Sequence, residues 1–525
     1  MEEKRRVVIV TGAAGGIGRA LLDAFHRGGD IIAAVDLPST NLLDITAALG
    51  PEHVGFHCDV ASEDEVVSLV AAIERRFGRI DVLVNNAALG PTMAATVDTD
   101  IASFRRTLSV NLRGPVVLAR EAARRMLRRG GVIVNVASLA GVLGNPKRNA
   151  YAASKAGLIS ATRLLAYEWA KHGIRVVAVA PGYIRTPMVA ELERSGRVNL
   201  EFVRRRVPLG RMGHPDEIAA VVRFLASPAA GYVTGTVLAV DGGWQSFNQP
   251  GDAYPPIVGT PDAELSRSGA MLRERIVVVI GADCIGEAIG QKFASAGDMV
   301  VVADKDSDRL AEVVHTLGPK HKVFGLDASS EQGVLALFTA IRQRFGRLDV
   351  LVNNAAVADS CPPALQQSAA DIDKFLEVNV VGVFLCAREA IKLMGDDGVI
   401  LNVASIDTSL PFAPGHAYGA SRAAIGILTR CMAAELGRAG VRTATIAQGC
   451  IRTPGMVALQ ASGRIDAAKI RRRIPLGRFG EPAEVANAAY FLASPEASYI
   501  NGSAPCVDGG LTSFGDAGDA SAACD

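Results

Sequence analysis

The chain has 525 residues, which is too long for one ordinary domain and indicates two to four. With 49% hydrophobic residues and a formal net charge of +1, the composition is that of a soluble packed protein, without an electrostatic reason to bind nucleic acid or an anionic membrane. No apolar run approaches the roughly 18 to 20 residues that cross a bilayer, and residues 1–10 do not resemble a signal peptide, so we expect a cytoplasmic protein. Eight cysteines without a Cys-x-x-Cys pair or a Cys/His cluster predict isolated thiols and no metal site.

In the first half of the chain, short apolar segments alternate with longer amphipathic ones. The expected strands are residues 7–10, 31–35, 53–57, 80–84, 132–136, 174–179 and 236–240. This alternation is typical of βαβ units, which build a parallel sheet covered by helices on both faces.

The second half repeats the landmarks of the first. The segments 85–87, 135–138 and 241–243 recur as 353–355, 402–405 and 508–510. The offset between the copies stays between 267 and 269 residues, which indicates tandem duplication of a whole domain and not a short solenoid repeat. The sequence therefore predicts the α/β class, with two doubly wound parallel-sheet domains in tandem.

The expected boundaries follow from composition. We place an N-terminal domain at residues 1–247 and a C-terminal domain at residues 273–514. Between them, residues 248–272 are rich in proline and glycine and are expected to form a linker. Residues 515–525 have little to bury and are expected to be a disordered tail.

A glycine-rich segment follows the first expected strand and leads into a helix. Glycines at positions 12, 15 and 18 permit a tight turn and a close approach of backbone to a pyrophosphate, while the helix N-terminus supplies N–H donors. Eighteen residues after Gly18, at the end of the next strand, Asp36 can accept both hydroxyls of an adenosine ribose and would repel a 2′-phosphate. The pattern predicts a dinucleotide site that prefers NAD to NADP.

A second constellation surrounds Tyr151. Lys155 lies four positions after it, at the start of a helix-forming run over 152–169, so both side chains share one helical face. A nearby cation favours the phenolate, so we expect Lys155 to pull the pKa of Tyr151 toward neutrality and make it a proton donor and acceptor. Thirteen residues upstream, Ser138 ends a buried strand at the sheet edge where ligands bind.

With these motifs in order in both halves, the sequence resembles the short-chain dehydrogenase/reductase family, which implies two Rossmann domains. By position, the resemblance implies a catalytic tetrad of Asn111, Ser138, Tyr151 and Lys155. It also implies a cofactor site made of Gly12, Gly15, Ile17, Gly18, Asp36, Asp59, Val60, Asn86, Tyr151, Lys155, Pro181, Gly182 and Thr186.

The family mechanism assigns a role to each member of the tetrad. Ser138 would polarise the substrate oxygen, Tyr151 would transfer the proton, and Lys155 would lower the pKa of the tyrosine and hold the nicotinamide ribose. Asn111 would support a water that relays the proton. The expected reaction is hydride transfer between NAD and a small secondary alcohol or ketone.

The second copy has lost parts of this machinery. Its loop, residues 280–286, is one residue shorter, lacks the middle glycine and places Asp283 where a pyrophosphate would lie. Asn379, Ser405 and Tyr418 remain, but Arg422 replaces the lysine and Gln448 replaces the proline, whereas the aspartate recurs as Asp304. We expect a pseudo-enzyme domain that keeps the fold without the chemistry.

Two further features bear on partners and substrate. Family members are commonly tetramers, so the resemblance implies that two tandem chains form a homodimer equivalent to a tetramer. Arginines 120, 124, 125, 128 and 129 and the run 204–206 are interpreted as solvated or interface faces in preference to a site for an anionic carrier. Lys147 and Arg148 are better placed to touch a polar substrate, and residues 183–212 are expected to form a lid.

Two alternatives remain open. One is an NADPH-dependent 3-oxoacyl thioester reductase, against which Asp36 argues. The other, from a different class, is a nucleotide-binding regulatory or scaffold protein in which both halves are inert.

Overall fold

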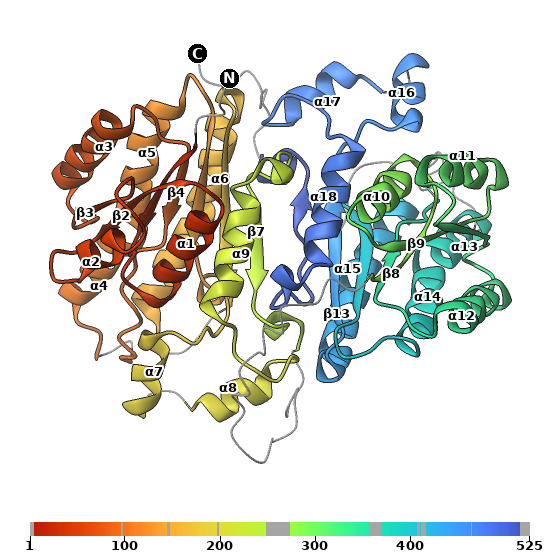
Figure 1. Cartoon of the computed structure of the whole chain (residues 1–525), viewed down its shortest axis with the longest axis horizontal. Helices are drawn as coiled ribbons and strands as arrows, with labels where there is room; N and C mark the ends of the chain where they lie inside the picture. Colours follow the sequence, from red (N-terminus) through yellow and green to blue (C-terminus); the bar gives the residue numbers. More distant parts are fainter. Residues whose placement is uncertain are drawn as a thin grey trace.

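The computed structural model describes residues 5–95, 98–143, 147–196, 199–247, 274–357, 369–406, 410, 416–463 and 465–514. These residues form two α/β domains, each built on one seven-stranded sheet whose paired strands are all parallel (Figure 1). The expected fold class is confirmed. The expected linker and tail lie outside the described residues.

The N-terminal sheet has the strand order β3-β2-β1-β4-β5-β6-β7. Its strands are β1 Val7–Thr11, β2 Ile31–Asp36, β3 Val54–His57, β4 Val82–Asn85, β5 Gly131–Val136, β6 Ile174–Pro181 and β7 Val237–Val240. All seven expected strands are present, because nearly continuous runs of buried valine, isoleucine and alanine suit a sheet covered on both faces.

Helices cover both faces of this sheet. They are α1 Gly16–Arg27, α2 Leu42–Ala47, α3 Glu63–Phe77, α4 Ile101–Leu108, α5 Gly114–Met126, α6 Asn149–Trp169, α7 Pro187–Arg194, α8 Leu200–Arg206 and α9 Pro215–Leu225. The π-helix η2 Ser109–Arg113 joins α4 to α5, and the 3₁₀ turn η6 Trp244–Ser246 follows β7. The expected lid segment forms α7 and α8, and α6 begins three residues before the expected start at 152.

The C-terminal domain repeats this arrangement in the order β10-β9-β8-β11-β12-β13-β14. Its strands are β8 Ile276–Ile280, β9 Met299–Asp304, β10 Lys322–Gly325, β11 Val350–Asn353, β12 Val399–Ser405, β13 Arg442–Gln448 and β14 Cys506–Val507. Its helices are α10 Cys284–Ser295, α11 Ser307–Leu317, α12 Glu331–Phe345, α13 Ala369–Leu376, α14 Gly382–Ile391, α15 His416–Leu436, α16 Pro454–Ala461, α17 Ala467–Arg473 and α18 Pro482–Leu492, with the π-helix η8 Glu377–Val381 and the 3₁₀ turn η11 Pro495–Ala497.

Buried amides tie the centre of each sheet to a covering helix. Asn85 donates to Asn135 Oδ1 at 2.9 Å, and Asn135 donates to the hydroxyl of Thr162 on α6, also at 2.9 Å. The same chain runs from Asn353 through Asn402 to Thr429 in the other domain. Because a buried amide without partners is unfavourable, these bonds fix the helix that carries the tyrosine against the sheet.

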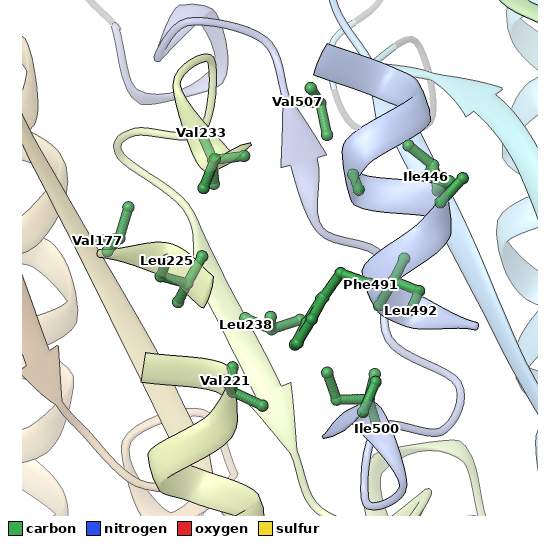
Figure 2. Packing of buried hydrophobic residues seen from close by; sticks show 14 of the residues in the cluster. Val177, Val221, Leu225, Val233, Leu238, Ile446, Phe491, Leu492, Ile500 and Val507 are labelled. Carbon is green, nitrogen blue, oxygen red and sulfur yellow. The ribbon is translucent and has the colours of Figure 1, made fainter. Parts of the chain in front are cut away.

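The two domains share one apolar core. Helix α9 and strand β7 face α18 and β14, and side chains such as Leu225 and Leu238 approach Phe491 and Ile500 across the boundary (Figure 2). The rings of Phe224 and Phe491 stack with centroids 3.9 Å apart. Helices α7 and α8 lie at the bottom of the view and α16 and α17 at the top, so the sheet edges from which these helices start point in opposite directions (Figure 1).

None of the helices within the described ranges is both long and apolar enough to cross a membrane.

Candidate active site

The glycine loop after β1 approaches its surroundings too closely for side chains. Gly12 has φ +64°, and a Cβ there would lie 2.8 Å from the backbone of Ala87. A Cβ on Gly18 would lie 2.0 Å from the carbonyl oxygen of Gly12. The Asn86 amide donates to the carbonyls of Thr11 and Gly12 at 2.9 and 3.0 Å, so it holds the turn in shape.

The start of α1 suits a pyrophosphate. Its N-cap is Gly15, which offers no side-chain acceptor, so the first N–H groups of the helix have no internal cap. Asp36 at the end of β2 accepts from Ala14 N and Leu37 N, each at 2.8 Å. Each carboxylate oxygen keeps a further lone pair for a ribose hydroxyl. Ile17, half-buried, packs on the core beneath the loop.

Asp59 and Val60, two residues of the expected cofactor site, follow the end of β3. Burial raises the pKa of Asp59, but bonds from Ala61 N and the Arg106 guanidinium outweigh it and hold that pKa below its usual range. Val60 is buried beneath this carboxylate, and Gly114 lies so close that a Cβ would be 2.6 Å from the Val60 carbonyl. The Arg106 ion pair fixes Asp59 at the edge of the site.

Ser138 and Tyr151 meet at the carboxyl ends of the strands. Ser138 follows β5, Tyr151 lies in the first turn of α6, and their hydroxyls are hydrogen-bonded. Burial raises the pKa of Tyr151 above its ordinary value, opposed by the Ser138 hydrogen bond and by the positive charge of Arg148. The expectation that Lys155 would pull the pKa of Tyr151 toward neutrality is therefore wrong for this structure, because desolvation of the phenol dominates.

Lys155 is anchored close to the tyrosine. Its ammonium donates to the Val136 carbonyl at 2.8 Å and lies 5.8 Å from the centroid of the Tyr151 ring. Burial lowers the pKa of Lys155 to about 8. The ammonium therefore loses its proton more readily than an exposed lysine does, and it contacts the backbone of the strand that leads to Ser138.

Asn111 lies in the π-helix η2, a type of distortion that often accompanies functional sites. Its side-chain oxygen accepts from Leu89 N at 2.8 Å, and its amide donates to the Leu89 carbonyl at 2.9 Å. In this structure the Asn111 side chain thus fixes the chain that leaves β4, and the expected water relay is a proposal.

Pro181, Gly182 and Thr186 lie on the far side of the site. Pro181 ends β6, and Gly182 N donates to the Val240 carbonyl at 3.0 Å. Thr186 caps α7 by accepting from Val189 N, and a Cβ on Gly16 would lie 3.3 Å from its methyl carbon. The base of the lid therefore touches the glycine loop.

Three aromatic and basic side chains, Arg148, Tyr183 and Trp244, contact one another near the site. The Arg148 guanidinium donates to the Tyr183 hydroxyl at 2.7 Å, and the Tyr183 ring packs on Trp244 with centroids 5.2 Å apart. Arg148 was expected to face a polar substrate and Tyr183 to begin the lid segment, whereas Trp244 carried no sequence signal beyond its neighbour Gly243.

The arginines of α5 are paired with acidic residues. Arg120 binds Glu63 and Glu121, Arg124 binds Glu121, and Arg125 binds Glu74 and Glu121. For these three side chains the interpretation as a balanced helix face is confirmed.

In the C-terminal domain, the N–H groups at the start of helix α10 are bound by a carboxylate of the same chain. The Asp283 carboxylate accepts from Ile285 N, Gly286 N and the Asn354 amide at 3.1, 2.9 and 2.8 Å. A cleft of about 140 Å³ remains beside Asp304, with Asp283 in its wall. The donors that would hold a pyrophosphate are thus bound to a carboxylate of the same charge.

The lysine position of this domain is also altered. Arg422 reaches the Val403 carbonyl only at 3.5 Å, and its buried Nε has no hydrogen-bond partner in the described part of the chain. Gln448, in place of the proline, leaves its Oε1 buried without a described partner. Such unpaired groups are unfavourable and do not reproduce the lysine site.

Comparisons with known proteins agree with this architecture. A family model described as enoyl-(acyl carrier protein) reductase matches the chain twice, at residues 12–245 and 280–512. A protein named an uncharacterised short-chain type dehydrogenase/reductase of Sinorhizobium fredii is 53% identical over 98% of this chain and 93% of its own length. The chain belongs to the short-chain dehydrogenase/reductase family and carries two tandem family domains.

Shorter relatives correspond to a single domain. A cis-4-hydroxycyclohexanecarboxylate dehydrogenase of Sinomonas cyclohexanicum is 40% identical over 46% of this chain and 96% of its own length. A 3-oxoacyl-[acyl-carrier-protein] reductase of Thermotoga maritima is 39% identical over 46% of this chain and 99% of its own length. The family shows that the chain is an oxidoreductase of nicotinamide-dependent type, whose homologues include alcohol dehydrogenases.

The lowered pKa of Lys155 makes stability depend on pH. In the unfolded chain the lysine keeps its proton up to about 10.5, but in the folded chain it loses the proton near 8. Between these values the unfolded state binds more protons, so stability rises with pH. At pH 7 we expect the Lys155→Met variant to be more stable than the unaltered protein, because it buries no charge. This difference in the free energy of unfolding should be about 2 kcal/mol smaller at pH 9.5, since each pH unit above the folded-state pKa of about 8 contributes about 1.4 kcal/mol. Urea unfolding of both proteins at the two pH values measures this; a constant difference would contradict it.

Proposed function

We propose that the chain is an NAD-dependent oxidoreductase that interconverts a small secondary alcohol and a ketone in its N-terminal domain. The observation that carries the proposal is the convergence of Ser138, Tyr151 and Lys155 at the same sheet edge as the uncapped start of α1. A proton carrier and a dinucleotide cradle at one edge are what hydride transfer to or from a carbon–oxygen group needs.

Each residue has a distinct role in this proposal. Ser138 holds the substrate oxygen, and Tyr151 takes or gives the proton at that oxygen. Lys155 can pass a proton onward because burial brings its pKa to about 8. A bound nicotinamide would supply or accept the hydride. Asn111 would support a relaying water while it fixes the chain at Leu89.

The choice of NAD rests on Asp36. Its carboxylate is held by two backbone N–H groups beside the glycine loop, where a ribose hydroxyl could bind and a 2′-phosphate would be repelled. The alternative, an NADPH-dependent 3-oxoacyl thioester reductase, is supported by the name of the Thermotoga maritima relative. The aspartate argues against this alternative.

The C-terminal domain is proposed to be a pseudo-enzyme. Support comes from Asp283, which occupies the N–H donors of α10, and from Arg422, whose Nε is buried without a partner in the described residues. The Asp283 carboxylate opposes the binding of an anionic cofactor, and the Arg422 guanidinium does not reproduce a lysine-like proton carrier.

A matched pair of tyrosine variants locates the chemistry. Tyr151→Phe should lower turnover at least about 100-fold with unchanged NADH affinity, because the proton carrier is lost while the ring remains. Tyr418→Phe, the equivalent change in the C-terminal domain, should leave turnover unchanged. The assay follows NADH formation from secondary alcohols, beginning with cis-4-hydroxycyclohexanecarboxylate, the compound in the name of one relative. Near-normal turnover in Tyr151→Phe would contradict the assignment.

A matched pair of aspartate variants tests cofactor choice and stoichiometry. Titration of NADH, followed by nicotinamide fluorescence, should give one site per chain and weaker NADPH binding. Asp36→Asn should weaken NADH binding about tenfold and narrow the gap to NADPH, because the charge that repels the 2′-phosphate is gone. Asp304 accepts from Ala282 N as Asp36 does from Ala14 N, so Asp304→Asn is the control and should change neither affinity. Two equivalent NADH sites would refute the pseudo-enzyme proposal.

We also propose that two chains associate as a homodimer. The contact between the two domains leaves large apolar side chains exposed on other helices, with Leu164 of α6, Ile427 of α15 and Phe384 of α14 exposed by 62%, 58% and 47%. Light scattering should give twice the 54.8 kDa of one chain, and Ile427→Glu should return the mass to that of one chain. A single-chain mass for the unaltered protein at micromolar concentration would overturn the proposal.

A further inference from the structure

We infer that the C-terminal domain positions the active site of the N-terminal domain through Tyr499 and Ser498. These two residues follow η11 and hold the segments that carry Tyr183 and Trp244. This inference rests on the proposed function, since it assumes that the working site is the one around Tyr151. It gives the pseudo-enzyme domain a task in catalysis that does not require a nucleotide.

Tyr499 fills a socket made by two glycines of the other domain. The side chain is fully buried, and a Cβ on Gly213 would lie 2.5 Å from its ring. A Cβ on Gly242, which has φ +64°, would lie 2.6 Å from the opposite edge of the ring. The ring is therefore clamped between the base of the lid and the turn after β7.

The polar groups of Tyr499 bind the same two segments. Its hydroxyl faces the carbonyls of Arg211 and Tyr183 at 3.2 and 3.4 Å, and its own carbonyl accepts from Gly242 N at 3.0 Å. The Tyr183 carbonyl also accepts from Gly213 N at 2.9 Å. Tyr499 thus binds both segments where residues 183–185 pair in parallel with residues 211–213.

From Tyr183 the contacts lead directly to the reacting groups. The Tyr183 hydroxyl accepts from Arg148, which precedes α6 and whose charge acts on Tyr151. Three residues beyond Tyr183, Thr186 lies against the glycine loop at Gly16. A shift of Tyr183 would therefore disturb both the start of α6 and the wall of the cofactor site.

Ser498 makes a hydrogen bond to the N-terminal domain that has no equivalent in the opposite direction. Its hydroxyl donates to Glu217 at 2.5 Å, and Glu217 is paired with the Arg211 guanidinium through contacts of 2.8 and 2.9 Å. The equivalent position in the N-terminal domain is Gly231, which has no side chain to offer to Glu484. Glu217 thus receives a side-chain hydrogen bond across the boundary that the equivalent position cannot give to Glu484.

The molecule contains its own control for Tyr499. Tyr232 is also fully buried and fits against Gly480 and Gly509, where added Cβ atoms would lie 2.5 and 2.6 Å from its ring. Its hydroxyl faces the carbonyls of Arg478 and Cys450 at 3.2 and 3.3 Å. Tyr232, which belongs to the N-terminal domain, therefore makes the equivalent contacts with the C-terminal domain, in which the site residues are altered.

The experiment compares Tyr499→Phe with Tyr232→Phe in the full chain. Each variant loses one hydroxyl in the same interface, so we expect equal small decreases in melting temperature. Only Tyr499→Phe should weaken NADH binding, by about three- to tenfold, and raise the KM for the alcohol that the unaltered chain oxidises. Amide hydrogen exchange at residues 182–186 should accelerate in Tyr499→Phe alone, a measurement that needs no substrate.

Each other outcome has a defined meaning. Equal effects of the two variants on NADH affinity and on exchange at 182–186 would show a merely structural role and overturn the inference, leaving the proposed function intact. Loss of NADH affinity in Tyr232→Phe alone would place the working site in the C-terminal domain. That result, or no NADH binding by the unaltered chain, would overturn the proposed function and the inference together.

Discussion

The structure depends on one constraint of parallel sheets: the carboxyl ends of all strands lie at the same edge of the sheet. In the N-terminal domain, Gly12, Asp36, Ser138 and Pro181 come from four different strands or their ends and still lie at this edge. The carboxylate of Asp36 and the amide of Asn86 then bind the glycine loop directly. Function in this fold is therefore decided by a few residues just beyond the strands, while the order of the strands is the same in both domains.

The two domains show how little has to change at that edge. Gly15 leaves the start of α1 without a side-chain cap, whereas Asp283 caps α10 with its carboxylate. A capping carboxylate stabilises a helix for the same reason that a bound phosphate does, since both accept from the first N–H groups. The C-terminal domain thus has, within its own chain, an acceptor of the kind that the N-terminal domain would take from a cofactor.

Much of this could be read from the sequence. Buried apolar runs at regular spacing located all seven strands of the first sheet, and the constant offset revealed the second domain. The glycine loop follows β1, Asp36 ends β2 and Tyr151 lies in the first turn of α6, and these positions agree with the spacing of their motifs. The early start of α6 at Asn149 was missed because boundaries depend on local backbone geometry, which composition specifies weakly.

Two other features could not be read in this way. The pKa of Tyr151 follows from how deeply the phenol is buried, and burial is a property of the whole packed site and not of a four-residue spacing. The contact of Tyr499 with Tyr183 joins residues 316 positions apart in the chain. It has no motif, because the Tyr499 ring fits against Gly213 and Gly242, which belong to the other domain.

The shared core of α9, β7, α18 and β14 also has a consequence for assembly. In separate chains, such a face would bind any copy of itself, and the proportion of unlike pairs would follow the concentrations of the two subunits. Covalent fusion makes the encounter intramolecular, with an effective concentration on the order of millimolar. The intact domain is therefore always paired with the altered one, at any dilution and in a fixed ratio of one to one.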